Sequence, residues 1–371
     1  MPQNASGTLF AHKQFSVALL HLCDGTRPPM PIAVRRADLH ADRVPLIELL
    51  VSSLRPDLDG REFDWLYREN PHGAARVWVA EDSDTGALVG AAAAFPRRMF
   101  VNGGEVSGCV LGDFCIRPSY RSLGPALQLQ RACLAEVDSG LFALGYDFPG
   151  QGMLAVYKRL GVEPRERMIR LAKPLRADRK IAEKVRSRGV ARGLSALSNV
   201  VLKLRDRGSK QAKKWAISLH EGDCGEEFSA LAREASAALG VCVVRSAAYL
   251  DWRFLKHPSR PYEILTARCG DALVGYVIFT HRGEDASVVD LFGLLESEIL
   301  RGLVARLVAL LRERGVITAS AAVLATHAHV ALLESLGFHR RESCPVALLP
   351  GTERGAEGGA PWFLMDGDRD S

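Results

Sequence analysis

The stretch from Leu111 to Gly161 decides the fold and reads LGDFCIRPSYRSLGPALQLQRACLAEVDSGLFALGYDFPGQGMLAVYKRLG. Its apolar beginning, Phe114 to Ile116, predicts a buried strand that ends before Pro118, because proline cannot continue a central strand. Apolar residues then recur at helical spacing from Leu127 to Val137, with polar residues between them. The pattern therefore predicts a strand, a glycine-containing turn and an amphipathic helix.

A second strand and a short helix follow. The apolar run from Leu141 to Tyr146 predicts the strand. The helix is expected over about Gly152 to Leu160; it carries Tyr157 and ends at Gly161, a residue suited to a left-handed C-cap.

The turn before the long helix reads RSLGPA, from Arg121 to Ala126. The first N–H groups of a helix have no intrahelical partner, and the helix dipole adds positive potential there, so the position suits a phosphate or pyrophosphate. Gly124 permits close approach of the backbone, and Pro125 fits the first helical turn. The R/Q-x-x-G-x-G/A pattern alone is weak evidence, since a plain strand-to-helix turn also uses glycine. Its place between a strand and a helix, with a tyrosine downstream, favours the phosphate site.

These residues resemble the core of the GNAT family of acyl-CoA N-acyltransferases. The resemblance implies acetyl-CoA as acyl donor, with its thioester and pantetheine along the strand and its pyrophosphate on the turn. The implied contacts on the strand are Phe114, Cys115 and Ile116, and those on the turn are Arg121, Ser122, Leu123, Gly124, Pro125, Ala126 and Leu127. Tyr157 matches the tyrosine that often protonates the leaving thiolate. Many members have Asn seven residues before that tyrosine, whereas this chain has Gly150.

The length of 371 residues and the apolar content of 47% predict about two globular domains. We expect no transmembrane segment, because no apolar run approaches 18 residues. The eight cysteines form no C-x-x-C pair, which suits reduced thiols and a cytoplasmic protein. No metal site is expected, although His327 and His329 are close in sequence. The residues before Met30 are expected to be an extension, and the true start is either Met1 or Met30.

Landmarks of the first half recur in order in the second half. Ala-Leu-Val-Gly occurs at Ala87–Gly90 and again at Ala272–Gly275, and Pro follows six residues after both Trp65 and Trp252. A tandem duplication explains this order. We therefore predict an α/β (α+β) chain of two GNAT-like domains, each a mixed, mostly antiparallel twisted sheet flanked by helices. The expected boundaries are 1–29 for the extension, 30–172 for the catalytic domain, 173–218 for a connector and 219–371 for the second domain.

The second repeat lacks the features of a cofactor site. Its corresponding turn, Leu294 to Gly302, has no R/Q-x-x-G-x-G/A pattern, and its Glu296 and Glu298 would repel a pyrophosphate. Leu333 stands where the first repeat has Tyr157. We expect a cofactor-free domain that shapes the acceptor pocket. The layout resembles tandem-GNAT proteins, some of them associated with polysaccharide biosynthesis, and Trp362 to Asp368 resembles their last strand.

A basic connector joins the repeats. Arg165 to Lys214 contains 17 Lys and Arg residues against four acidic ones, a local net charge of +13 within a chain total of +5. This charge fits either a solvated helical connector or a surface for an anionic partner, tRNA included.

Acyl transfer needs a donor for the thioester oxygen, a base for the amine proton and an acid for the thiolate. Backbone N–H groups of the 114–116 strand provide the donor and Tyr157 the acid, unless Tyr157 is only a core aromatic with a satisfied hydroxyl. We favour Asp113 as the base, with Asp147 and Glu81 as alternatives, and each of the three is also compatible with a turn or capping role. Catalysis by positioning, without a dedicated base, is the remaining alternative.

The sequence thus predicts an N-acetyltransferase that acts on an amine of a small molecule, with an amino sugar or sugar nucleotide favoured by the family association. The acceptor amine attacks directly within a ternary complex. Two alternatives remain: an aminoacyl-tRNA-dependent transferase and an inactive acyl-CoA-binding module. Two repeats in one chain form a pseudo-dimer, which buries the surface that single-domain relatives use to dimerise. We therefore expect a monomer.

Overall fold

The computed structural model describes residues 32–178, 181, 215–294, 297–350 and 360–370. The expected N-terminal extension and most of the basic connector (179–180 and 182–214) lie outside the described residues, as does Glu296. Within the described residues no helix is long and apolar enough to cross a membrane.

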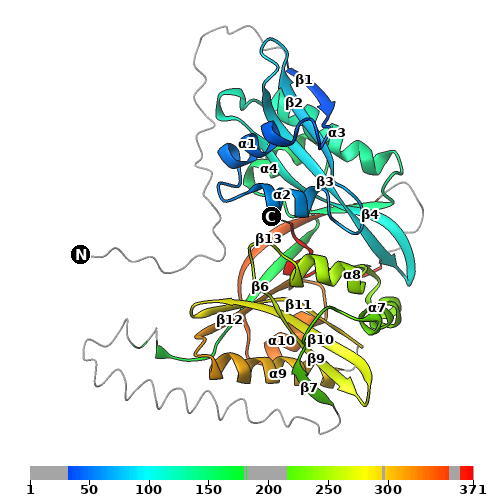
Figure 1. Ribbon diagram of the computed structural model, residues 1–371, viewed down its shortest axis with the longest axis vertical. Helices are drawn as coiled ribbons and strands as arrows, with labels where there is room; N and C mark the ends of the chain where they lie inside the picture. Colours follow the sequence, from blue (N-terminus) through cyan, green and yellow to red (C-terminus); the bar gives the residue numbers. More distant parts are fainter. Residues whose placement is uncertain (1–31, 179–180, 182–214, 295–296, 351–359, 371) are drawn as a thin grey trace.

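The chain forms a mixed α/β fold around one twisted sheet (Figure 1). The first half contains β1 (Ile32–Arg36), α1 (Arg43–Ser53), α2 (Gly60–Tyr67), β2 (Arg76–Asp82), β3 (Leu88–Val101), β4 (Gly104–Ile116), α3 (Leu123–Asp138), β5 (Leu144–Asp147), α4 (Gln151–Leu160) and β6 (Glu166–Pro174), with a 3₁₀ turn η1 (Pro118–Tyr120) before α3. The second half contains β7 (Ala216–Leu219), α7 (Glu226–Leu239), β8 (Val241–Val243), α8 (Ala247–Leu250), η2 (Asp251–Leu255), β9 (Glu263–Cys269), β10 (Ala272–Arg282), β11 (Asp285–Gly293), α9 (Ser297–Glu313), β12 (Thr318–Leu324), α10 (His329–Ser335), β13 (His339–Pro350), β14 (Trp362–Phe363) and η3 (Asp366–Asp368). The order from β2 to β6 recurs from β9 to β13.

Local sequence explains several of these boundaries. Strand β4 ends at Ile116, immediately before the Arg117-Pro118 pair, as predicted. The Asn102-Gly103 pair joins β3 to β4 as a tight hairpin, with φ of 50° and 86° at these two residues, the geometry of a type I′ turn. Helix α4 ends at Gly161, whose φ of 75° is the expected left-handed C-cap.

The predicted strand over Leu141–Tyr146 starts too early. Strand β5 begins at Leu144, and the Leu141 side chain is 45% exposed. Gly140 turns the chain with a φ of 78° after α3, so the apolar run begins in a surface loop rather than in the sheet. The expected last strand is also short: β14 covers Trp362–Phe363, and Asp366–Asp368 form a 3₁₀ turn.

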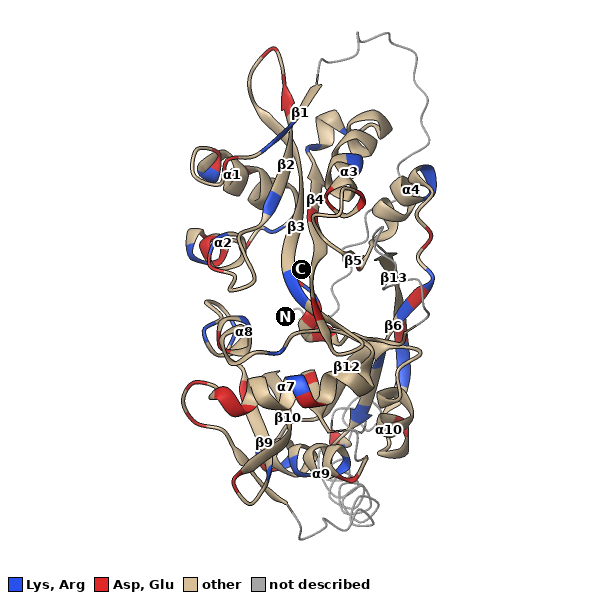
Figure 2. Ribbon diagram, turned by 90° about the vertical axis from the view of Figure 1, so that its right-hand side faces the viewer, with Lys and Arg blue, Asp and Glu red and all other residues tan. Residues whose placement is uncertain are grey.

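Helices cover both faces of the first half of the sheet. Figure 2 shows α1 and α2 on one side of β2, β3 and β4, and α3 and α4 on the other. Apolar residues of α1 and α2 belong to a large core that continues into the second half, whereas those of α3 and α4 form a separate core. The sheet is therefore buried on both faces near the 111–161 stretch.

The two halves exchange their last strands. Strand β6 pairs with β12 of the second half, and β13 pairs with β5 of the first half. The two exchanged strands also pair with each other, so the sheet runs without a break through both halves. The predicted boundary at residue 172 falls inside β6.

A reciprocal contact of two tryptophans joins the halves at their centre. The indole N–H of Trp65 donates to the carbonyl of Trp252 at 2.8 Å, and that of Trp252 donates to the carbonyl of Trp65 at 2.9 Å. The rings stack with centroids 4.9 Å apart. Contacts in which residue i meets j as j meets i are characteristic of a two-fold axis.

The C-terminal segment is held between the halves by buried charges (Figure 1). Arg245 binds both Asp290, at 3.0 Å, and Asp368, at 2.9 Å. Arg97 of β3 binds Asp370. These side chains are almost fully buried, so each charge depends on its partner and the segment is fixed in place.

Candidate functional site

Strands β4 and β5 form a fork. They pair in parallel at three positions only, the last of which joins Val110 to Tyr146. Beyond it, β4 continues from Leu111 to Ile116 paired with β3 alone, while β5 pairs with β13 on its other side over Leu144–Asp147. In the described part of the chain no strand pairs with the fork-facing edge of β4. The backbone of Phe114, Cys115 and Ile116, which the resemblance places against the pantetheine, therefore belongs to an edge without a strand partner.

A bulge in β4 places Asp113 at this fork. The register between β3 and β4 shifts between Ala91 and Ala93, and Asp113 has a positive φ of 46°. Such bulges re-aim side chains near functional sites. The carboxylate of Asp113 is buried, at 3% exposure of the residue.

The partners of Asp113 come from the α1–α2 region, which the sequence did not reveal. Its Oδ2 accepts from the hydroxyl of Tyr67 at 2.6 Å and lies 3.5 Å from Nη1 of Arg55, which also binds Glu62. Its Oδ1 is buried without a hydrogen-bond partner among the described residues. Burial raises the pKa of Asp113, against the opposing effect of Arg55 and Tyr67. A base with a raised pKa and one oxygen without a hydrogen-bond partner suits removal of a proton from an amine.

The turn from Arg121 to Leu127 lies where the sequence predicted it, at the N-terminus of α3. Ser122 is the N-cap, but its side chain makes no capping hydrogen bond. None of the described residues accepts a hydrogen bond from the N–H groups of Leu123 or Gly124. A Cβ added to Gly124 would meet nothing within 4 Å, so the space above the helix end is open. These features fit an anion and are not required by packing of the protein.

Tyr157 of α4 belongs to the core formed with α3, whereas Tyr67, which binds Asp113, belongs to the other core. Tyr157 is fully buried, and its hydroxyl donates to Oδ2 of Asp147 at 2.6 Å and accepts from Nε2 of Gln130 at 3.2 Å. Burial and the adjacent Asp147 raise the pKa of Tyr157 well above its usual value. Asp147 follows the last residue of β5 that pairs with β4, so this cluster lies at the apex of the fork.

The remaining sequence candidates lie apart from this cluster. Glu81 pairs with Arg35 of β1, with Nε and Oε2 2.7 Å apart. Gly150 is the N-cap of α4, with open space around it. His327 and His329 are in contact with each other and with Phe363 in the second half, where burial lowers the pKa of both rings.

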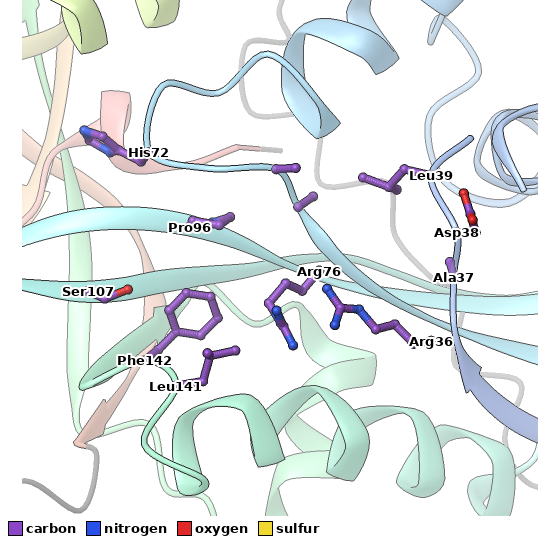
Figure 3. A pocket seen from close by; sticks show the side chains of 12 residues that line it. Arg36, Ala37, Asp38, Leu39, His72, Arg76, Pro96, Ser107, Leu141 and Phe142 are labelled. Carbon is purple, nitrogen blue, oxygen red and sulfur yellow. The ribbon is translucent and has the colours of Figure 1, made fainter. Parts of the chain in front are cut away.

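A cavity of about 570 Å³ lies away from the fork (Figure 3). Its lining includes Arg36 of β1 and Arg76 of β2, together with Ser107 and Phe142 beside the opposite end of the β4–β5 pairing. The backbone geometry of the fork and of the α3 turn, rather than this cavity, marks the candidate site, because it brings the predicted residues together.

Residues 54–165 match the family model described as an acetyltransferase (GNAT) domain. The match includes the fork, the α3 turn and Tyr157. The chain contains a GNAT acetyltransferase domain.

Solved structures resemble the chain well beyond this GNAT domain. A probable N-acyltransferase from Enterococcus faecalis aligns with a TM-score of 0.61 over 86% of this chain and 72% of that chain, at 14% identity. A GCN5-related N-acetyltransferase from Anabaena variabilis aligns with a TM-score of 0.62 over the same shares, 86% and 72%, at 15% identity. A glucosamine N-acetyltransferase region of a fungal multi-domain β-N-acetylglucosaminidase aligns with a TM-score of 0.54 over 88% of this chain and 39% of that chain, at 13% identity. At these identities the likeness concerns the fold alone. No curated protein sequence matches the chain.

The second half contains a corresponding fork, between β11 and β12. These strands pair in parallel from Asp285 to Val288 and then diverge. The C-terminal segment enters the gap: Met365 bridges to Val323 of β12 and its Sδ accepts from the N–H of Leu291 of β11 at 3.1 Å. Met365 is fully buried. This fork is therefore filled by the chain itself.

Proposed function

We propose that the chain is an acyl-CoA-dependent N-acyltransferase that transfers acetyl from acetyl-CoA to an amine of a small molecule. The observation that carries the proposal is the open fork beside the α3 turn, where unpartnered N–H groups and the bare Gly124 face open space. The GNAT family match over the same residues supports it.

The chain's own residues have distinct roles in this proposal. Backbone N–H groups of the α3 turn bind the pyrophosphate, and those of the 114–116 strand hold the thioester carbonyl as charge develops on its oxygen. Asp113 takes the proton of the amine through its unpaired Oδ1. Tyr157 gives a proton to the leaving thiolate. The amine attacks directly, with donor and acceptor bound together.

We propose further that the chain is a tandem pair of GNAT-like domains in which only the first binds acyl-CoA. The repeated element order, the reciprocal Trp65–Trp252 contact and the exchange of β6 and β13 support the duplication. The filled fork between β11 and β12 supports a second domain without acyl donor. Since the pseudo-dimer buries the central surface, we expect a monomer in the cytoplasm.

An amino sugar or sugar nucleotide remains the acceptor that we favour, with a role in polysaccharide biosynthesis. One similar structure is described as a glucosamine N-acetyltransferase region, which is consistent with this choice.

Two measurements test the proposal. Calorimetry should show binding of acetyl-CoA to the full chain, and thiol release should rise when amines are added from a panel that includes glucosamine and amino-sugar nucleotides. Binding with no thiol release for any amine would favour the inactive acyl-CoA-binding module. A chain that binds no acetyl-CoA but retains tRNA at low salt would favour the aminoacyl-tRNA-dependent transferase.

A further inference from the structure

The hydroxyl of Tyr157 lies between two buried polar side chains from different elements. Asp147 stands at the end of β5, and Gln130 projects from α3. The two distances to the hydroxyl oxygen are 2.6 Å from Asp147 and 3.2 Å from Gln130. Gln130 is 2% and Asp147 8% exposed, so neither group relies on solvent for its hydrogen bonds.

The protonation state of Asp147 decides which way the hydroxyl proton of Tyr157 points, because the cluster has few donors and acceptors. A phenol has one proton to donate and two lone pairs, and a primary amide donates through its nitrogen. With Asp147 ionised, the Tyr157 proton is bound to the carboxylate and cannot reach a thiolate. With Asp147 protonated on Oδ2, its O–H and the Gln130 amide occupy both lone pairs of the phenol. The phenol proton must then point in the third direction, away from both.

We propose that Asp147 is a positioning residue that turns the Tyr157 proton toward the fork and replaces it once it is used. The proposal rests on the acyl transfer proposed above. In the transfer, the amine nitrogen bonds to the acyl carbon and the carbon–sulfur bond breaks. The sulfur takes the phenol proton of Tyr157, and the phenol oxygen takes the carboxyl proton of Asp147. The surplus proton of the amine leaves through Asp113, and water later reprotonates Asp147, so the protons balance.

Gln130 has the second role in the cluster. Its amide holds one lone pair of the Tyr157 oxygen in both protonation states of Asp147, so the hydroxyl has only two directions left for its proton. The hydroxyl therefore donates either to the Asp147 carboxylate or toward the fork, and to no third group.

Asp147 is the group of this cluster that titrates near neutral pH. Burial raises its pKa to about 6, against the hydrogen bonds from Tyr157 and the Phe148 N–H and the charge of Arg369. The other titratable or charged groups that act on Asp147 or on the same buried cluster are Cys133 and Glu136 of α3, Cys109 of β4, Tyr157 of α4 and Arg369 of the C-terminal segment. Burial raises the pKa of both thiols and of the phenol, so these remain neutral, and Glu136 is paired with Arg76.

The test compares Asp147→Asn with a matched variant. Asparagine retains a donor for the phenol oxygen but has no proton to pass on. The control is Asp82→Asn, because Oδ2 of Asp82 also accepts from a tyrosine hydroxyl, that of Tyr120, at 2.6 Å outside the fork apex. Thiol release is measured at saturating acetyl-CoA with one fixed amine from pH 5.5 to 8, and acetyl-CoA affinity is measured by calorimetry.

We expect Asp147→Asn to bind acetyl-CoA as the wild type does and to release thiol about 10- to 100-fold more slowly at pH 5.5. The ratio of wild-type to variant rate should fall to one or below as the pH rises through about 6, because ionised Asp147 has no proton to pass on and holds the Tyr157 proton, whereas asparagine still donates to the phenol oxygen. Asp82→Asn should leave the ratio near one throughout. An unchanged rate in Asp147→Asn, or a pH-independent ratio, overturns the proposal.

A second readout does not depend on turnover. In the full chain with ¹³C-labelled aspartate, the Asp147 carboxyl resonance, assigned by its loss in Asp147→Asn, should titrate near pH 6 and at higher pH in Tyr157→Phe, which lacks the donor to the carboxylate. A carboxyl that stays ionised from pH 4.5 to 8 overturns the relay even if the enzyme is active. A wild-type chain that binds no acetyl-CoA contradicts the proposed function instead.

Discussion

Gly124→Glu is the sharpest test of the acyl-CoA site, because the protein itself does not need a glycine at this position. A Cβ there meets nothing within 4 Å, and Gly124 is the second residue of α3. Glutamate in the first turn of a helix stabilises it by about 0.3–1 kcal/mol through the helix dipole, and it is a better helix former than glycine. The variant should therefore fold with an unchanged or slightly higher Tm.

The same carboxylate opposes the ligand. A unit negative charge about 5 Å from one charge of the pyrophosphate costs roughly 3 kcal/mol at an effective dielectric constant of about 20. That energy corresponds to a rise of Kd by about 100-fold, before any steric effect of the side chain. Calorimetry of acetyl-CoA measures the change, and its size should shrink as salt is added.

Val44→Glu provides the matched control. Val44 is also the second residue of a helix, α1, and is 60% exposed on the other side of the sheet from α3. The variant adds the same charge at the same helix position without approaching the fork, so acetyl-CoA should bind as in the wild type. Equal affinities of Gly124→Glu and the wild type would show that the α3 turn holds no pyrophosphate.

Four further predictions concern the catalytic cluster, the centre of the molecule and the second fork. Tyr157→Phe should lower kcat by about 10²-fold or more with little change in acetyl-CoA affinity, and an unchanged kcat would remove its role as acid. Trp65→Ala should lower the free energy of unfolding by about 3–5 kcal/mol, because it removes a buried ring that stacks on Trp252 and one of the two reciprocal hydrogen bonds; urea denaturation measures the loss, and a change below about 1 kcal/mol would contradict it. Asp147→Asn should raise the unfolding free energy at pH 8 by as much as about 3 kcal/mol but not at pH 4. The pKa of Asp147 is raised to about 6 in the native state, so the native state holds a proton that the unfolded state has already lost. The stability of the wild type therefore falls as the pH rises through this range, and that of the variant does not. Calorimetry should give one acetyl-CoA per chain, because Met365 fills the second fork, and a stoichiometry of two would refute this.

The sequence predicted the local features of the site because each depends on neighbouring residues. Pro118 ends the strand, Gly124 marks the open turn, and Gly161 ends the helix that carries Tyr157. The strand expected at Leu141 was wrong at its start, because apolar periodicity does not register the turn at Gly140.

Contacts between distant residues were not predictable in this way. Tyr67 and Asp113 are 46 residues apart, and Gln130 and Tyr157 are 27 apart, so no spacing rule connects them. The exchange of β6 and β13 was missed for a related reason. Periodicity identifies a strand, but the partner of a strand depends on the path of the whole chain.

The two forks differ for a reason that follows from the proposed duplication itself. Duplication produces two equivalent forks, β4–β5 and β11–β12, but the described segment 360–370 lies at only one of them. That segment can fill only one of them, and the fork it fills is that of the second half, through Met365. The first fork is left open, and the α3 turn with its bare Gly124 lies beside that one. The proposed asymmetry, with one acyl donor per chain, therefore follows from the Met365 side chain in the second fork and from the difference between the two turns.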